Sequence, residues 1–201
     1  PQGAARFFAM EEIMTLDEIR KSVSDVKDEI WRQAVNNGRD PKIYMHWTAG
    51  AYDMDYPDYH FSIRADGSVV QTHDFFTNIE ATYMRNSGSV AVSLDCCADA
   101  VAYAGGGCDL GNYPPTSAQV ECLAQVVAVI AAALDIPIDL PHVMTHAEAA
   151  DNLDGLYPCD PYGPAHTCER WDLAVVSEDE DWMTGGDTIR GKALFYQAQG
   201  V

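Results

Sequence analysis

Two capping boxes mark where the chain begins its two clearest helices, and the strand-like segments between them limit the fold class. Thr15-Leu16-Asp17-Glu18 and Thr116-Ser117-Ala118-Gln119 each place a hydroxyl at the N-cap and a Glu or Gln three residues later. After the first box, apolar residues recur every three or four positions, which predicts an amphipathic helix over residues 15–35, ended by Gly38 or an Asn. The second helix, 116–134, is apolar on more than one face, so we expect it to lie across a sheet.

Strand patterns lie between these helices and follow the second one. Lys42–Trp47 is typical of a buried strand, and the Asp-Gly pair at 66–67 predicts a hairpin. The other expected segments are hairpin strands at 60–64 and 68–72, strands at 89–95 and 142–145, loops at 104–115 and 151–168, a helical turn at 147–150, and a strand or helix at 188–197. This order predicts an α/β or α+β fold with a central mixed sheet flanked by helices. We expect one domain over residues 1–201, with its core at 42–173 and a tail at 174–201.

Acidic residues exceed basic ones by 31 to 12, which gives a formal net charge of −19. This charge disfavours binding to nucleic acid, whose phosphates are neutralised by Lys and Arg, and adhesion to anionic membranes. The richest apolar run, 126–134, is shorter than the roughly 18 residues of a spanning helix, so we expect no membrane insertion. Residues 1–8 lack an initiator Met and the apolar core of a signal peptide, which favours synthesis in the cytoplasm.

Two histidines stand where predicted strands end. His46 precedes the polar turn Thr48-Ala49-Gly50, and His146 follows the strand-like Val143-Met144-Thr145. Side chains at strand ends can converge on one cleft although they are far apart in the sequence. With Asp172 as a third group, they match the two imidazoles and one carboxylate of a catalytic zinc site. The alternative is that both histidines are hydrogen-bonded core or rim residues.

The residues around these positions resemble the zinc-dependent N-acetylmuramoyl-L-alanine amidases, which include phage lysozyme-like amidases and peptidoglycan recognition proteins. The resemblance covers about 42–173, in the family's order. It rests on an apolar strand ending in His46-Trp47-Thr48, a Tyr59-His60-Phe61 strand with its Asp-Gly hairpin, a central strand beginning near Ser89, the helix at Thr116, Thr145-His146-Ala147-Glu148, and Arg170-Trp171-Asp172.

The resemblance implies one zinc ion per chain, held by His46, His146 and Asp172, and a peptidoglycan or muropeptide substrate. Zinc would lower the pKa of a coordinated water toward about 7, so that it can attack the amide between muramic acid and L-alanine. Arg170 and Tyr59 match the family's catalytic Lys and Tyr. Arg170 would stabilise the oxyanion but cannot shuttle a proton, because a guanidinium does not titrate near neutrality.

Several roles stay open in the sequence. The general base is Tyr59, Asp95 or the metal hydroxide, because Ser93 stands where some family members have a Glu on the central strand. Cys168 is an alternative third ligand. We expect Trp47 and Thr48 to bind substrate, although Trp47, like Tyr52, Tyr56 and Tyr83, is equally explained by packing. The remaining histidines, His60 in the core and His73, His142 and His166 as ordinary polar residues, are not expected to be ligands.

The leading hypothesis is therefore a monomeric amidase acting at the periplasm or cell wall. A phage endolysin, a secreted antibacterial effector with a cognate inhibitor protein, and a cytoplasmic recycling enzyme all fit. The alternatives are a non-catalytic peptidoglycan-binding module and a hydrolase with Cys96 or Cys97 as nucleophile. The even number of cysteines, six, permits disulfides.

Overall fold

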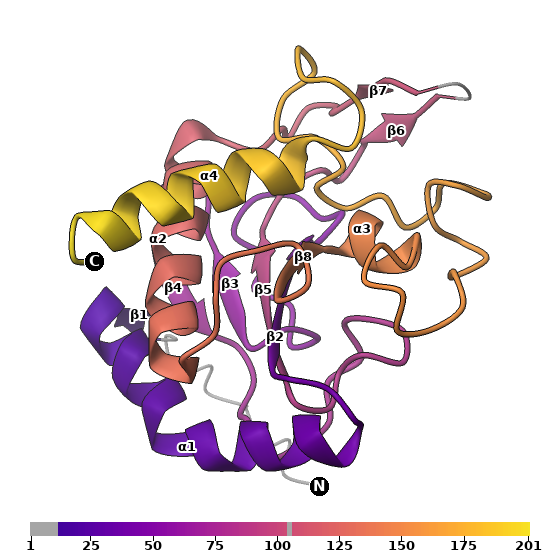
Figure 1. The fold of residues 1–201 in the computed structure, drawn as a ribbon. Helices are drawn as coiled ribbons and strands as arrows, with labels where there is room; N and C mark the ends of the chain where they lie inside the picture. Colours follow the sequence, from indigo (N-terminus) through magenta and orange to yellow (C-terminus); the bar gives the residue numbers. More distant parts are fainter. Residues whose placement is uncertain (1–11, 104–105) are drawn as a thin grey trace, which may run out of the picture.

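The structure, a computed structural model, describes residues 12–103 and 106–201 (Figure 1). The expectations about the N-terminal residues 1–8, and about positions 104–105 of the predicted loop, lie outside the described residues. The elements are β1 Ile13–Met14, α1 Leu16–Asn36, β2 Lys42–Trp47, β3 Phe61–Ile63, β4 Val69–Gln71, β5 Ser89–Leu94, β6 Val101–Ala102, β7 Cys108–Asp109, α2 Ser117–Leu134, β8 Val143–Thr145, α3 His146–Ala150 and α4 Gly185–Ala198.

Both predicted helix starts are confirmed. Thr15 accepts a hydrogen bond from the Glu18 amide and Glu18 reaches back to the N-cap, and Thr116 and Gln119 form the same reciprocal pair at the start of α2. After α1, Gly38 adopts φ +70°, the left-handed conformation that a helix end favours. Capping residues satisfy amides that have no partner inside the helix, so these short motifs fix the helix starts without help from packing.

Six strands form one mixed sheet in the order β1-β4-β3-β5-β2-β8. The central strand β2 runs parallel to β5 and β8, and β3 runs parallel to β5, whereas the β3–β4 hairpin and the edge strand β1 pair antiparallel. The expected mixed sheet with flanking helices, of the α+β class, is confirmed. The sequence did not predict β1, or the small β6–β7 pair that partly occupies the expected 104–115 loop.

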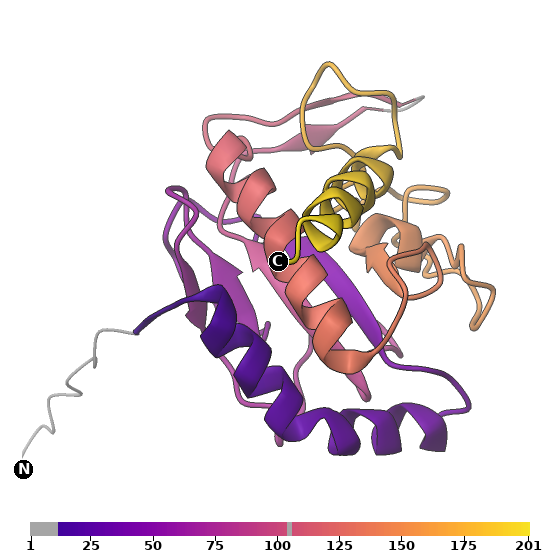
Figure 2. The ribbon, with the colours of Figure 1, turned by 60° about the vertical axis from the view of Figure 1, so that its left-hand side comes forward.

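Helix α2 lies across one face of the sheet, packed against β2, β3 and β5, with α1 and α4 on either side of it (Figures 1 and 2). Strand alternation sends Met45 and Trp47 into the apolar core under α2, while Tyr44 packs against Met144 and Ala149 in a second cluster. His46 follows the alternation of Tyr44, so it points away from α2. The long helices α1, α2 and α4 therefore build the core on one face of the sheet. His46, at the end of β2, lies on the opposite face.

Helix α2 is also the one helix in the described ranges that is long and apolar enough to cross a membrane, and 67% of that window is buried inside the protein. The expectation that no apolar run reaches this length is wrong, because residues 117–125 add apolar positions between their polar ones. Burial of this kind is what a core helix under two neighbouring helices shows.

Candidate functional site

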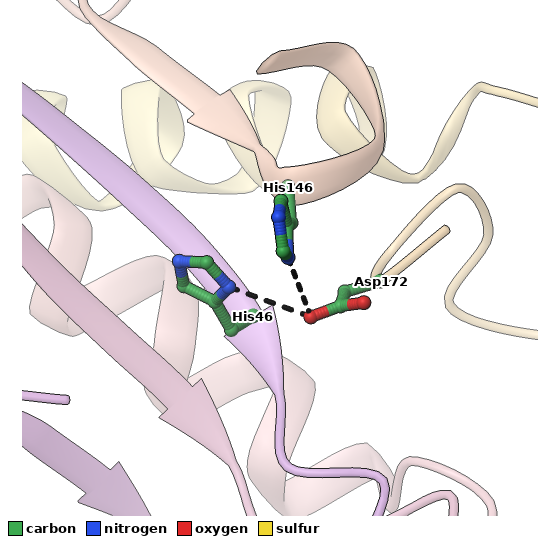
Figure 3. A group of neighbouring side chains, drawn as sticks. All are labelled: His46, His146 and Asp172. Carbon is green, nitrogen blue, oxygen red and sulfur yellow. Dashed lines mark hydrogen bonds and ion pairs between the residues drawn. The ribbon is translucent and has the colours of Figure 1, made fainter. Parts of the chain in front are cut away.

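The register of the sheet brings the two histidines together. Strand β2 pairs in parallel with β8 so that Met45 lies opposite Thr145, and each is followed directly by a histidine. His46 and His146 therefore stand side by side at the carboxyl ends of neighbouring strands, where ligands bind in open parallel sheets. Their ring centroids are 4.7 Å apart (Figure 3).

Asp172 joins this pair from a segment without regular structure. The backbone amide of Ala147, beside His146, donates to the Asp172 carbonyl at 3.2 Å, which ties the segment to the start of α3. One carboxylate oxygen, Oδ2, then faces both imidazoles, at 3.1 Å from Nδ1 of His146 and 3.4 Å from Nδ1 of His46 (Figure 3). The three predicted ligands converge, and their ligand atoms all lie within 4.8 Å of one another.

Burial and charge act together on these groups. Burial lowers the pKa of His46 to about 4, and the hydrogen bond to Asp172 only partly opposes it, so this imidazole is neutral at pH 7. Burial also opposes ionisation of Asp172, but the facing His146 and His46 hold the pKa of that carboxyl below its usual range. A neutral imidazole beside an ionised carboxylate is the protonation state that a divalent cation requires.

The geometry fits a zinc ion. Two ligands bonded at 2.0–2.1 Å in a tetrahedron stand about 3.3 Å apart, close to the 3.1 Å and 3.4 Å that separate the carboxylate oxygen from the two nitrogens. Nε2 of His146 is buried without a hydrogen-bond partner among the described residues. The donor set of two imidazoles and one carboxylate is one that catalytic zinc sites use.

Thr82 supports the site from outside the ligand set. Its hydroxyl lies 3.1 Å from Nε2 of His46, on the side of the ring away from Asp172. If that nitrogen carries the proton, Nδ1 presents its lone pair to a metal, which is how outer contacts usually orient a ligating histidine. Thr82 is itself fixed by its amide, which donates to Asn86 Oδ1 at 2.7 Å. The sequence offered no signal for this residue.

A cleft with a volume of about 400 Å³ opens beside His146 and Asp172. Its lining comes from four separated parts of the chain: Tyr59, residues 80–84 with Asn86, His146, and Arg170 with Asp172. In the 80–86 segment the sequence singled out only Tyr83, and it gave no signal for the other lining residues, among them Glu80, a carboxylate of the cleft besides Asp172.

Tyr59 and Arg170, the two predicted catalytic residues, both line this cleft. The Tyr59 ring lies 5.0 Å from the His46 ring. Burial, with the charge of Asp172 next in size, raises the pKa of the Tyr59 hydroxyl, so it stays protonated and can donate a hydrogen bond. The Arg170 guanidinium pairs with Asp160 and stands over the rings of Tyr162 and Tyr83, at 5.0 Å and 5.9 Å from their centroids.

Comparison with known proteins identifies the family. The profile of the N-acetylmuramoyl-L-alanine amidases (Amidase_2) matches residues 32–161, more than half of the chain. The chain belongs to this amidase family. No curated protein matches the chain. Among solved structures, the endolysin N-acetylmuramoyl-L-alanine amidase LysCS from Clostridium intestinale is similar to 54% of this chain and 70% of its own, with a TM-score of 0.39 and 15% identity.

The amidase family match contains His46, Tyr59, Thr82 and His146, but it ends before Arg170 and Asp172. Asp172, the predicted third ligand, therefore comes from a part of the chain that lies outside the match, and it joins the histidines through the contacts described above. Family membership supports peptidoglycan amidase activity for this chain.

Trp47 and Thr48, expected to bind substrate in this amidase, do not line the cleft. Trp47 is 3% exposed and packs edge-on against Trp171, with ring centroids 4.7 Å apart. It follows His46 on a strand and so faces the opposite side, into the core. The half-buried Thr48 accepts a hydrogen bond from the Gly50 amide within its own turn. The packing interpretation of Trp47 is the one that its burial supports.

The other candidate groups of the amidase lie elsewhere. His60 is buried and stacked on Phe75, as expected of a core residue. Cys168 lines a different cavity, with His166 and Trp182, and is not part of the ligand group. Asp95 is fully buried, where its carboxylate accepts hydrogen bonds from Ser62 and the Asp55 amide. It does not line the cleft, so its position does not support a role as general base.

The structure leaves all six cysteines free. Cys96 and Cys97 are 0% and 2% exposed, and burial raises the pKa of the Cys96 thiol well above its usual value. A nucleophilic cysteine needs an accessible, readily formed thiolate. The structure thus gives no support to the cysteine hydrolase alternative.

Proposed function

We propose that this chain is a zinc-dependent hydrolase that cleaves the amide between N-acetylmuramic acid and L-alanine of peptidoglycan. The observation that carries the proposal is the convergence of His46, His146 and Asp172, with spacings that suit tetrahedral coordination, beside a cleft that His146 and Asp172 line. All three would hold one zinc ion. A bound zinc supplies Lewis-acid chemistry, polarising the scissile carbonyl and activating the attacking water.

The chain's own residues position the substrate and stabilise charge. Tyr59 stays protonated, so its hydroxyl would donate a hydrogen bond to the carbonyl oxygen as negative charge develops there. Arg170 adds fixed positive charge at the same cleft, held by Asp160 and by the tyrosine rings around it. Neither residue acts as a base in this proposal. Tyr59 keeps its proton at neutral pH, and an arginine guanidinium is always charged in proteins.

The proposal treats the chain as one catalytic domain that acts at the bacterial cell wall as a monomer. Because the net charge is −19, binding to an anionic wall must come from the cleft and not from long-range attraction. An endolysin or a secreted antibacterial effector fits this activity. The competing role, a peptidoglycan-binding module without turnover, is disfavoured because all three ligand positions hold competent residues.

The test is digestion of purified peptidoglycan, followed by mass spectrometry, with and without a metal chelator. We expect stem peptides with a free N-terminal alanine, lost with the chelator and restored by zinc. His46→Ala, His146→Ala and Asp172→Ala should each abolish both cleavage and zinc binding. His166→Ala is the matched control, because that imidazole is exposed and lies outside the ligand group. Intact sacculi from zinc-loaded protein would support the binding module, and cleavage that survives chelation would exclude the zinc mechanism.

A further inference from the structure

Arg190, on the C-terminal helix α4, makes a dense set of buried contacts that the proposed chemistry does not explain. Arg190 is 6% exposed, and its guanidinium donates four hydrogen bonds. Nη1 reaches Glu148 Oε2 at 2.8 Å and the Val143 carbonyl at 2.9 Å. Nη2 reaches Glu148 Oε1 at 2.7 Å and Asp187 Oδ1 at 2.6 Å. The Arg190 guanidinium therefore links both oxygens of the Glu148 carboxylate to the backbone of β8.

Glu148 in turn fixes the turn that carries His146. Its Oε2 accepts from the Thr145 amide at 2.8 Å, and its own amide donates to the Thr145 hydroxyl at 3.2 Å, which forms the capping box of α3. His146 is the first residue of α3, between these two partners. Any displacement of the Glu148 carboxylate would loosen the backbone on either side of the ligand.

The start of α4 also approaches the segment after Asp172. The Gly185 amide donates to the Ala174 carbonyl at 3.0 Å. A Cβ at Gly185 would overlap the Leu173 carbonyl, and one at Gly186 would overlap the Glu148 carboxylate. Two glycines thus let the helix lie directly against the surroundings of both His146 and Asp172. Helix α4 lies beyond the residues of the family match, so this arrangement belongs to the chain's C-terminal part.

We propose that Arg190 is a positioning residue for the metal ligand His146, acting through Glu148, and that α4 is for this reason part of the catalytic unit. The inference rests on the proposed zinc site. Without Arg190, both oxygens of the buried Glu148 carboxylate would lose the guanidinium that holds them, and the carboxylate would move toward water. That movement would disturb the cap and the orientation of His146.

The experiment measures the zinc dissociation constant of the full chain by competition with a chelating dye. Arg190→Met removes the charge at similar length and should weaken zinc binding by about 10-fold, the lower end of the effect of losing a direct outer contact of a ligand, because Arg190 acts through Glu148. Arg190→Lys keeps the charge but loses the pair of hydrogen bonds to the two Glu148 oxygens. Its zinc affinity should lie between those of Arg190→Met and the wild type. In Arg190→Met/Glu148→Gln the amide can still cap α3 without a buried charge, so zinc affinity should recover relative to Arg190→Met alone.

Lys192→Met is the matched control on the same helix. Lys192 pairs with Glu121 of α2, at the partly exposed surface, and has no contact with Glu148. This variant should weaken the docking of α4 but leave zinc affinity unchanged. If Arg190 only stabilises the fold, Arg190→Met will lower the melting temperature while the folded protein keeps the wild-type zinc affinity, which overturns the inference. If Arg190→Met does not fold, the same comparison of zinc affinity with melting temperature is made on Arg190→Lys and on Arg190→Met/Glu148→Gln.

Failure of the two proposals can be told apart. Wild-type protein that binds zinc and releases stem peptides, together with an Arg190→Met variant of unchanged zinc affinity, refutes the positioning role alone. Wild-type protein that binds no zinc refutes both.

Discussion

Replacing Tyr59 by Phe tests the central assignment of the cleft, because the substitution removes one hydroxyl and little else. The ring contact with His46, at 5.0 Å between centroids, can persist in the variant. Burial and the nearby carboxylates raise the pKa of the hydroxyl, so the wild-type group is a hydrogen-bond donor throughout the neutral range. Loss of one preorganised oxyanion donor lowers kcat by about 10²–10³, equivalent to about 2.7–4 kcal/mol. We expect a fall in kcat at the lower end of this range for Tyr59→Phe, since the residue is only half-buried.

The assay is the release of stem peptides from soluble muropeptides by the zinc-loaded enzyme, with kcat and KM resolved. Zinc affinity should not change, because Tyr59 is not part of the ligand group. Tyr83→Phe is the control, since its ring stands over Arg170 in the same cleft and the substitution keeps that contact. If kcat of Tyr59→Phe stays within about threefold of the wild-type value, Tyr59 stabilises no transition-state charge and the reasoning fails.

Two further predictions concern Thr82, which contacts His46, and the core residue His60. Thr82→Val should weaken zinc binding by about 10- to 100-fold by removing the contact of its hydroxyl with His46 Nε2, whereas Thr82→Ser should retain most of the affinity; equal affinities in competition titrations would contradict this role. Burial, with a smaller contribution from the nearby His73, lowers the pKa of His60 to about 3 in the folded protein. Between pH 3 and the unfolded value of about 6.5 the unfolded chain therefore binds the extra proton, and stability rises with pH. His60→Asn should therefore reduce the slope of unfolding free energy against pH by up to about 1.4 kcal/mol per pH unit, measured by urea denaturation of zinc-free protein between pH 4 and 6; an unchanged slope would contradict the assignment.

The parts of the fold that could be predicted from sequence are those that local chemistry determines. Capping boxes fixed the starts of α1 and α2, and an unbroken buried pattern marked β2 at its observed bounds. The two-residue strands β1, β6 and β7 were not predicted, because so short a pairing depends on what lies opposite and carries no pattern of its own. For α4 the sequence left strand and helix open, and its burial against α2 decides the matter.

The residues of the site likewise fall into those that a local sequence pattern marks and those that only tertiary structure brings together. His46 and His146 stood out because each ends a recognisable strand, and parallel strands present their carboxyl ends at one edge. Thr82 and Glu80 lie in a segment without periodicity, so only tertiary structure brings them to the cleft. Trp47 lies beside His46 in the sequence, but adjacent strand residues face opposite sides, so its 3% exposed side chain packs in the core and not at the cleft.

The three proposed ligands are also held in different ways, and this has a consequence for how the site forms. His46 sits in a central strand with 0% exposure, paired on both sides, so its position follows from the sheet alone. His146 depends on a capping box that the buried Arg190–Glu148 pair reinforces. Asp172 belongs to an irregular segment, fixed near the site by the Ala147 amide and followed by residues that α4 packs against. Segments with few regular hydrogen bonds open at the lowest free-energy cost. The carboxylate therefore lies in the segment that opens most readily, and zinc affinity should respond to changes at the start of α4, where Gly185 packs against residues 173–175, even when the sheet stays intact.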